Sequence, residues 1–370
     1  MGECQLCGKS SPEIAQILKL CPQCIKENPD HALKIATQVH QINRKKYDLP
    51  GSIPENPTGI ICKQCSNQCK LEESQIGYCG LYSNHEGTIK PRMRTTKEAL
   101  LHTYRDALPT NCCNSYFCPA GTKNGYPTYS YIPGPEYGFY NQAAFLYGCN
   151  FDCLGCQNPS HKNLHDAPKY TITKFIDEVR ANPKISCVCW FGGSPEPQLA
   201  WSIKASTATI ALAKQTNRII RICWEWNGGG NPKLAQYAVK LSLNSGGNAK
   251  FDLKYSPSSI LCQIFSGTSN QSVYENFSRC FNAYYHKREE PVLSATTLLI
   301  PGYIDAEEVE KIAQFLANHD QSIPYSLLVF FPAYFLPDLP VTTKKQAESC
   351  LKIAKQYLET VHLGNQHLLT

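Results

Sequence analysis

Residues 141–370 alternate short apolar runs with longer stretches in which apolar residues recur at helical spacing. The apolar runs predict strands near residues 143–148, 186–191, 219–224, 249–253, 292–300 and 325–332. The amphipathic stretches predict helices near residues 171–181, 196–215, 232–242, 270–287, 305–318 and 343–359. Strands that alternate with helices in this way favour a parallel sheet with right-handed crossovers. We therefore expect an α/β fold in this part of the chain.

Residues 1–140 lack this alternation and carry eleven of the 20 cysteines. Apolar spacing predicts a helix from Asp30 to Lys46, and three prolines between Leu49 and Pro57 indicate a linker after it. We divide the chain into three parts: a first cysteine-rich module with its helix, a second cysteine-rich module with a Gly-, Pro- and Tyr-rich connector, and the α/β domain, at residues 1–57, 58–140 and 141–370.

The composition argues against a small secreted disulfide scaffold and against a membrane protein. The chain has 370 residues without an apolar run of about 18, and its first residues lack the basic and apolar regions of a signal peptide. We therefore expect a cytoplasmic protein with no membrane partner. In a long chain of this kind many cysteines favour metal binding over disulfides. The net charge of +6 permits an acidic partner without requiring one.

Two CxxC pairs near the start have the spacing of a structural zinc site, because each pair places two thiolates on a tight turn. They are Cys4 with Cys7 and Cys21 with Cys24. A segment this short cannot bury enough apolar surface to fold alone, so a bound metal must supply the missing stability. The sequence therefore predicts a zinc-ribbon-like module with four cysteine ligands.

Two further groups of cysteines follow before the α/β domain. Four thiols within 18 residues predict a second closed metal site, whose metal the spacing leaves open: Cys62, Cys65, Cys69 and Cys79. For a third set an auxiliary cluster, further zinc ligands and simple packing are all open: Cys112, Cys113 and Cys118. The cysteines that come late in the chain are expected to pack as small apolar residues: Cys187, Cys189, Cys223, Cys262, Cys280 and Cys350.

The loop after the first predicted strand of the α/β domain carries Cys149, Cys153 and Cys156. Three thiolates on one short loop can hold an iron–sulfur cluster, and a cubane held by three protein sulfurs leaves one iron open for a ligand. This CxxxCxxC pattern resembles the cluster loop of the radical S-adenosylmethionine (SAM) superfamily. The resemblance implies a [4Fe-4S] cluster, SAM, an electron donor such as ferredoxin or flavodoxin, and a partial (β/α)6 TIM-like barrel.

Later segments resemble the family's SAM-binding motifs, which lie after successive strands. Gly192 and Gly193 match a GGE motif in which Ser194 replaces the acid, so Glu196 is the expected substitute. The same resemblance assigns cofactor contacts after the following strands to Asn227, Asp252 and Lys254. Glu225 is a candidate acceptor for ribose hydroxyls, with an ion pair in the barrel core as an equal alternative. Asp252 and Lys254 are two apart on a strand and point to one face, so a purely structural ion pair is an equal alternative.

The spacing CxxCxxxC with a later GxCG, and motifs such as Ile300-Pro301-Gly302, resemble the pyruvate formate-lyase activating enzyme-related, AmmeMemoRadiSam-like group. This implies reductive cleavage of SAM to a 5'-deoxyadenosyl radical that abstracts hydrogen, with glycyl-radical activation of a partner protein as the expected outcome. Modification of RNA or of another protein, and a non-catalytic zinc or iron–sulfur binding protein, are the alternatives. Nothing in the sequence names the substrate.

Overall fold

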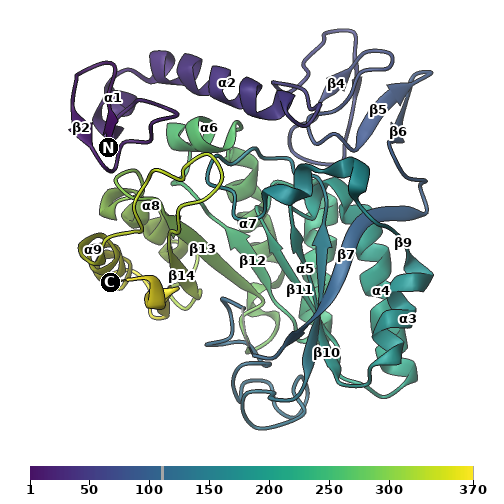
Figure 1. Cartoon of the computed structure of the whole chain (residues 1–370). Helices are drawn as coiled ribbons and strands as arrows, with labels where there is room; N and C mark the ends of the chain where they lie inside the picture. The colour runs from purple at the N-terminus through teal and green to yellow at the C-terminus, as the bar shows by residue number, and fades with distance from the viewer. Residues whose placement is uncertain (110–111, 370) are drawn as a thin grey trace.

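The structure is a computed structural model that describes residues 1–109 and 112–369. Within these residues the main sheet has nine strands (Figure 1). Seven are parallel and lie in the order of the chain: β8 (Tyr140–Leu146), β10 (Ile185–Gly192), β11 (Arg221–Trp226), β12 (Ala249–Asp252), β13 (Leu293–Leu299), β14 (Tyr325–Val329) and β15 (Val361–Gly364). At the other edge β7 (Glu98–Ala107) pairs antiparallel with β8 and β9 (Lys169–Thr171).

The predicted α/β architecture is confirmed, with the six predicted strands in place and one parallel strand more. The helices between the strands are α3 (Ile172–Ala181), α4 (Leu199–Gln215), α5 (Pro232–Ser245), α6 (Ile260–Ser266), α7 (Gln271–Tyr284), α8 (Ala306–Ala317) and α9 (Lys344–Ala354). The prediction of a helix to residue 359 was wrong at its end, because α9 stops at Ala354 and the chain turns into the additional strand β15.

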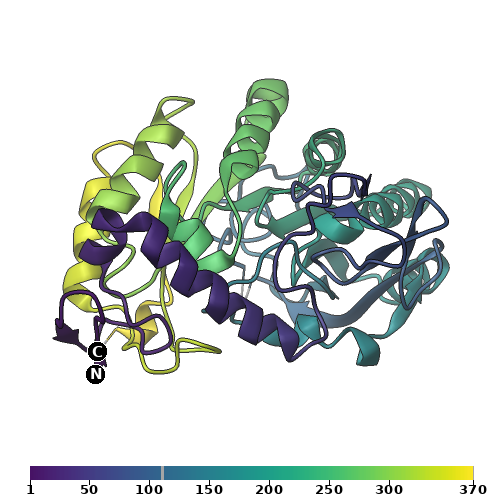
Figure 2. The ribbon, with the colours of Figure 1, turned by 90° about the horizontal axis from the view of Figure 1, so that it is seen from above.

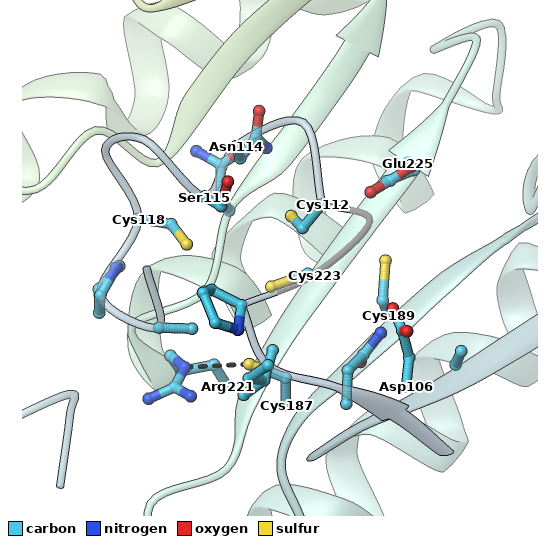
Figure 3. Close-up of a pocket in the computed structure, with 18 of the residues that line it drawn as sticks. Asp106, Cys112, Asn114, Ser115, Cys118, Cys187, Cys189, Arg221, Cys223 and Glu225 are labelled. Carbon is cyan, nitrogen blue, oxygen red and sulfur yellow. Dashed lines mark hydrogen bonds between the residues drawn. The ribbon is translucent and has the colours of Figure 1, made fainter. Parts of the chain in front are cut away.

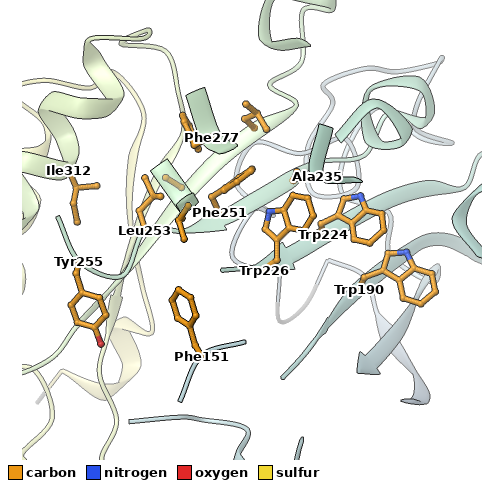
Figure 4. Packing of buried hydrophobic residues seen from close by; sticks show 14 of the residues in the cluster. Phe151, Trp190, Trp224, Trp226, Ala235, Phe251, Leu253, Tyr255, Phe277 and Ile312 are labelled. Atoms are coloured by element: carbon orange, nitrogen blue, oxygen red, sulfur yellow. The ribbon is translucent and has the colours of Figure 1, made fainter. Parts of the chain in front are cut away.

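The two faces of the sheet differ because side chains alternate along each strand. One face is apolar and packs on helices: Trp190, Trp224 and Trp226 are each at most 1% exposed, and their rings follow one another across β10 and β11 (Figure 4). Phe251 continues the row on β12, with its ring centroid 5.2 Å from that of Trp226. The alternate positions, which include Glu225, point to the opposite face and line the cavities described below.

The first module lies against the C-terminal half of the domain. Its elements are a short hairpin, β1 (Gly2–Glu3) with β2 (Ser10–Ser11), and the helix α1 (Pro22–Glu27). The hydroxyl of Tyr303 accepts a hydrogen bond from the Ala15 N–H at 3.0 Å and donates one to the Leu20 carbonyl at 2.8 Å. Lys26 also pairs with Glu307 of α8 at 2.7 Å. The module is therefore docked on the domain through specific polar contacts.

Helix α2 (Pro29–Lys45) leaves this module and crosses the top of the domain, as the view from above shows (Figure 2). It packs on α6 through a buried face that includes Ala32, Ala36 and Val39. At its end it meets the second module, which contains the hairpins β3 (Ile60–Ile61) with β4 (Lys70–Leu71) and β5 (Tyr82–His85) with β6 (Thr88–Pro91). The helix thus connects both cysteine-rich modules across the sheet.

No helix in residues 1–109 or 112–369 has the length and apolar content needed to cross a membrane.

Candidate active site

A cavity of about 290 Å³ opens over the carboxyl ends of the parallel strands. Its volume is close to the roughly 300 Å³ at which pockets for organic ligands begin. The three thiols of the loop after β8 line it: Cys149, Cys153 and Cys156. Most of the other residues assigned to SAM line it too: Gly192, Gly193, Glu225, Asn227, Asp252 and Lys254. The structure therefore brings together segments that lie more than 100 residues apart.

The three loop thiols lie near one another but not tightly enough for a single tetrahedral ion. Burial first, and the neighbouring Cys153 thiol second, raise the pKa of Cys149 well above its ordinary value and that of Cys156 to about 11. Among the described residues, sets of three or more Cys, His, Asp or Glu ligand atoms within 4.8 Å of one another comprise only the N-terminal quartet. Three thiols on one wall with this wider spacing fit a polynuclear cluster better than a single zinc ion, whose bonds to sulfur are about 2.3 Å.

The cysteine loop is anchored to the rest of the protein by its own residue Asp152, a fully buried carboxylate. It accepts a hydrogen bond from His40 Nδ1 at 2.8 Å, pairs with Arg44 Nη1 at 3.4 Å, and contacts Lys162 Nζ. Burial works against its ionisation, but the hydrogen bond from His40 and the charges of Lys162 and Arg44 hold the pKa of Asp152 well below its ordinary value. Two of these partners, His40 and Arg44, come from helix α2. The N-terminal helix therefore orders the cysteine loop.

We expect Asp152→Asn to lower the free energy of unfolding by about 3–5 kcal/mol, because it leaves the buried cations Arg44 and Lys162 without their counter-charge. The matched control is Asp177→Asn, which removes an exposed partner of Arg180 on α3 and should cost less than about 1 kcal/mol. Chemical denaturation of anaerobically purified protein measures both. Equal losses in the two variants would show that Asp152 does not organise the loop.

A network of buried amides joins the cysteine loop to the segment after β11. Asn227 Nδ2 donates to Asn150 Oδ1 at 2.7 Å and to Ser194 Oγ at 3.0 Å, and Asn150 Nδ2 donates to the Gly229 carbonyl at 3.0 Å. Asn227 Nδ2 also lies 3.9 Å from Cys149 Sγ. Asn227 thus lies beside the first loop cysteine, and Asn150 and Ser194 are its supports. No pattern in the sequence marks Asn150 as a site residue. Ser194 is marked only because it stands where an acid is expected.

The two glycines of the segment after β10 are required by the fold itself. Gly192 has φ +116°, and a Cβ there would lie 2.5 Å from the Leu146 backbone nitrogen. A Cβ on Gly193 would lie 2.2 Å from the Gly148 carbonyl oxygen. The chain after β10 therefore passes directly against the end of β8, which places both glycines on the cavity wall beside the cysteine loop.

Glu196 lies behind this wall and is not among the residues that line the cavity. It is fully buried in a 3-10 turn, Glu196–Gln198, and its Oε1 accepts the Gly228 N–H at 2.7 Å. Its Oε2 has no hydrogen-bond partner among residues 1–109 and 112–369. Burial raises the pKa of Glu196 to about 7. In this position Glu196 holds the loop after β11 in place, so any effect on a ligand passes through that loop.

This raised pKa gives a pH-dependent prediction. The buried carboxyl favours the protonated form, so its contribution to stability is full below about pH 4.5 and is lost as pH rises through about 7, a change of about 3 kcal/mol. We expect Glu196→Gln, which keeps an acceptor for Gly228 but cannot ionise, to lose less unfolding free energy than the unaltered protein between pH 5 and pH 8. Chemical denaturation at the two pH values checks this, and parallel losses would contradict it.

Four charged side chains on the same face form a continuous row of alternating sign. Lys250 Nζ lies 3.3 Å from Glu225 and 3.1 Å from Asp252, and Lys254 Nζ lies 2.6 Å from Asp252. Against the effect of burial, the charges of Lys250 and Lys254 lower the pKa of Asp252. The ion pair anticipated between Asp252 and Lys254 is present, and both residues also face the cavity. Structural pairing and ligand contact are thus compatible here.

Gly155, the residue before Cys156, lies closely against side chains from the segment after β14. A Cβ at this position would lie 3.1 Å from Leu336 Cδ1 and 3.3 Å from Phe330 Cε2. Phe330 is fully buried there. This tight contact favours glycine at position 155.

The N-terminal quartet has the geometry of a site for one metal ion. The Sγ atoms of Cys4, Cys7, Cys21 and Cys24 all lie within 4.8 Å of one another. Against the effect of burial, backbone N–H groups, that of Cys21 first, lower the pKa of Cys4 to about 6, which favours the thiolate that a metal requires. The four thiols can bind a metal, as the spacing predicted.

The thiols of the second cysteine group are buried and lie farther apart than those of the N-terminal quartet. Burial, and after it the charges of Cys79, Cys69 and Cys62, raise the pKa of Cys65 well above its ordinary value, so the four thiols share one region. They are not among the described sets of three or more ligand atoms within 4.8 Å. The second module also contacts the amide network. Asn67 Nδ2 donates a hydrogen bond to the Asn150 carbonyl at 2.7 Å, and the Ser66 N–H donates one to the Gly229 carbonyl at 2.9 Å. A metal here would stabilise the amide network from outside.

Arg44, near the end of α2, is buried although it begins a basic run in the sequence. It is 1% exposed, pairs with Asp152, and its guanidinium carbon lies 3.5 Å from the ring centroid of Tyr78 in the second module. The basic run Arg44-Lys45-Lys46 follows a helical pattern in the sequence, and the distant partner Asp152 gave no local signal. Only the tertiary contact shows that this cation is structural.

Comparison with protein families gives one match, to the radical SAM superfamily, over residues 144–316. The matched region runs from β8 to α8 and contains the cysteine loop and every strand that lines the cavity except β14. A comparison with curated proteins gives no match. Residues 144–316 thus form a radical SAM superfamily domain, which implies radical chemistry with a [4Fe-4S] cluster and SAM.

Proposed function

We propose that the protein cleaves SAM reductively at a [4Fe-4S] cluster held by Cys149, Cys153 and Cys156. The observation that carries this proposal is that three thiols of one loop line a ligand-sized cavity together with glycine, amide and charged groups on the neighbouring strand ends. When bound, the cluster would supply the electron that converts SAM to methionine and a 5'-deoxyadenosyl radical. In this proposal the parallel strands would act as the partial barrel that the resemblance implies, with β15 as one strand more than the expected six.

The residues of this chain would bind and orient SAM. Asp252 and Glu225 offer carboxylates at the cavity wall that suit an ammonium group or ribose hydroxyls, and Lys254 offers a cation for a carboxylate. The backbone of Gly192 and Gly193 permits close approach of the ligand. Because these groups are fixed by one another and by the sheet, little reorganisation is needed on binding, and reacting atoms are held in line.

For the substrate we propose a macromolecular partner, with a glycyl radical on a protein as the product. Support comes from the surface at the cavity: Phe331 is 53% exposed, and its carbonyl accepts a hydrogen bond at 3.1 Å from Gln157, which lines the cavity. An exposed phenyl group next to a residue that lines the cavity suits contact with an apolar surface of a protein. The electron would come from a small redox partner such as ferredoxin or flavodoxin.

Anaerobic turnover tests the proposal. The reconstituted protein with dithionite and SAM should form 5'-deoxyadenosine, and its absence would leave a non-catalytic metal-binding protein. A macromolecular extract should then raise the rate. Protease treatment of the extract should remove this increase and nuclease treatment should not, and the opposite result would favour an RNA substrate. A glycyl radical predicts an electron paramagnetic resonance signal that persists on the partner after SAM is exhausted.

A further inference from the structure

A second cavity lies on the same face of the sheet, beside the amino-terminal halves of β10 and β11 (Figure 3). Its volume is about 90 Å³. One buried water needs roughly 10–15 Å³ by the same measure, the space open to its centre. The cavity therefore has room for a group of several heavy atoms. It shares Phe191 and Glu225 with the cavity that the cysteine loop lines, which we call the SAM cavity. The two cavities are therefore neighbours along the strands.

Sulfur atoms from two separate parts of the chain line this cavity. Cys187, Cys189 and Cys223 come from alternate positions of β10 and β11, opposite the tryptophan face, and Cys189 is in register with Cys223. Cys112 and Cys118 come from the loop that crosses over these strands (Figure 3). The expectation that all six late cysteines pack in the core holds for Cys262, Cys280 and Cys350, which belong to the main apolar cluster. Cys187 and Cys189 are also buried, and Cys187 packs with Leu108 and Ala120 in a small apolar cluster, but these two and Cys223 also face the cavity.

A buried guanidinium lies beside one of the strand thiols. Arg221 Nε is 3.2 Å from Cys187 Sγ, and the same side chain pairs with the buried Glu136 at 2.5 Å. A nearby guanidinium favours the thiolate form that binds metals.

Polar contacts, and not apolar packing alone, fix the loop over the cavity. Asn114 Nδ2 donates to Asn248 Oδ1 at 2.7 Å, and Ser294 Oγ donates to Asn114 Oδ1 at 3.1 Å. Ser326 Oγ donates to the Cys113 carbonyl at 3.2 Å. These partners lie beside or on β12, β13 and β14, so the two loop thiols are held at a defined place above the strand thiols.

We propose that Cys112, Cys118, Cys187 and Cys223 bind a second iron–sulfur cluster. The four thiols belong to no described set of three ligand atoms within 4.8 Å, so they are spread around the cavity more widely than a tetrahedral zinc site requires. Thiolate sulfurs that surround a space of several atoms match the requirement of a cluster with two or four irons. The proposal goes beyond cleavage of SAM, because the cavity is separate from the loop that holds the first cluster.

Iron content in a background without the first cluster tests the proposal. In a Cys149→Ala/Cys153→Ala/Cys156→Ala protein, reconstituted anaerobically, the further changes Cys118→Ser and Cys223→Ser should remove about two or four irons, with matching acid-labile sulfide. The control pair Cys280→Ser and Cys350→Ser alters buried thiols away from the cavity and should leave both contents unchanged. Unchanged iron in the test variant, or loss of zinc in place of iron, would overturn the proposal.

A measurement on the unaltered protein covers the case in which the variant does not fold. Cys112 and Cys118 are partly exposed, so a small alkylating reagent should reach them. We expect mass spectrometry to show at least about tenfold slower alkylation of both in the anaerobic iron-loaded protein than after iron is removed by a chelator under reducing conditions, which leave the freed thiols reduced. Equal alkylation before and after iron removal would overturn the proposal, and so would a disulfide between these residues in the iron-loaded protein.

Discussion

Replacing Cys153 with alanine should reduce formation of 5'-deoxyadenosine by more than about 100-fold. Even groups that only support metal ligands typically contribute 10–100-fold, and Cys153 is proposed to be one of only three ligands. Its Sγ lies 3.2 Å from Ser266 Oγ and lines the SAM cavity. The measurement is 5'-deoxyadenosine per chain under dithionite, together with iron content, which should fall by about four atoms.

Cys262→Ala is the matched control for this variant. Cys262 is fully buried on α6, close to the same loop, but it does not line the SAM cavity. Loss of this thiol should lower stability modestly and leave cleavage of SAM within about threefold of the unaltered protein. If both variants lost cleavage equally, the assignment of the cluster to Cys149, Cys153 and Cys156 would be wrong.

Replacing Cys4 with alanine should prevent the N-terminal quartet from binding a metal ion and unfold the segment before α2. Structural zinc contributes on the order of 10 kcal/mol to small modules of this kind, which far exceeds what so short a segment gains from its own core. We expect the variant to lose one zinc per chain and to be cleaved rapidly by protease within the first 28 residues. Zinc analysis and limited proteolysis measure this.

Cys350→Ala is the control for the loss of a buried thiol without a metal. Cys350 lies in the main core on α9 and should keep the zinc and the protease resistance of the unaltered protein. The Cys4 variant should still bind iron under anaerobic conditions, because His40 and Arg44 lie in α2, after the segment that unfolds, but it should lose that iron faster in air. Retention of zinc after loss of Cys4 would show that the quartet is not the zinc site.

The sequence allowed the sheet to be predicted because strands such as Ile185–Gly192 are short, apolar and followed by glycine. It also pointed to the thiols of Cys149, Cys153 and Cys156, because their close spacing within one loop can be seen in the sequence itself. It could not show that Arg44 and His40 reach Asp152, since that contact joins residues more than 100 positions apart. The sulfur-lined cavity did leave a trace: Cys187 and Cys189 alternate with Val188 and Trp190, so they point away from the apolar face.

Helix α2 connects the N-terminal quartet, which can bind a metal ion, to the loop that is proposed to hold the cluster. The helix begins just after the N-terminal quartet. Near its other end His40 and Arg44 contact the buried carboxylate of Asp152 in the cysteine loop. Occupancy of either site should therefore favour occupancy of the other, and thermodynamic reciprocity requires the same factor in both directions. Removal of a metal ion from the quartet should then make the proposed cluster easier to lose.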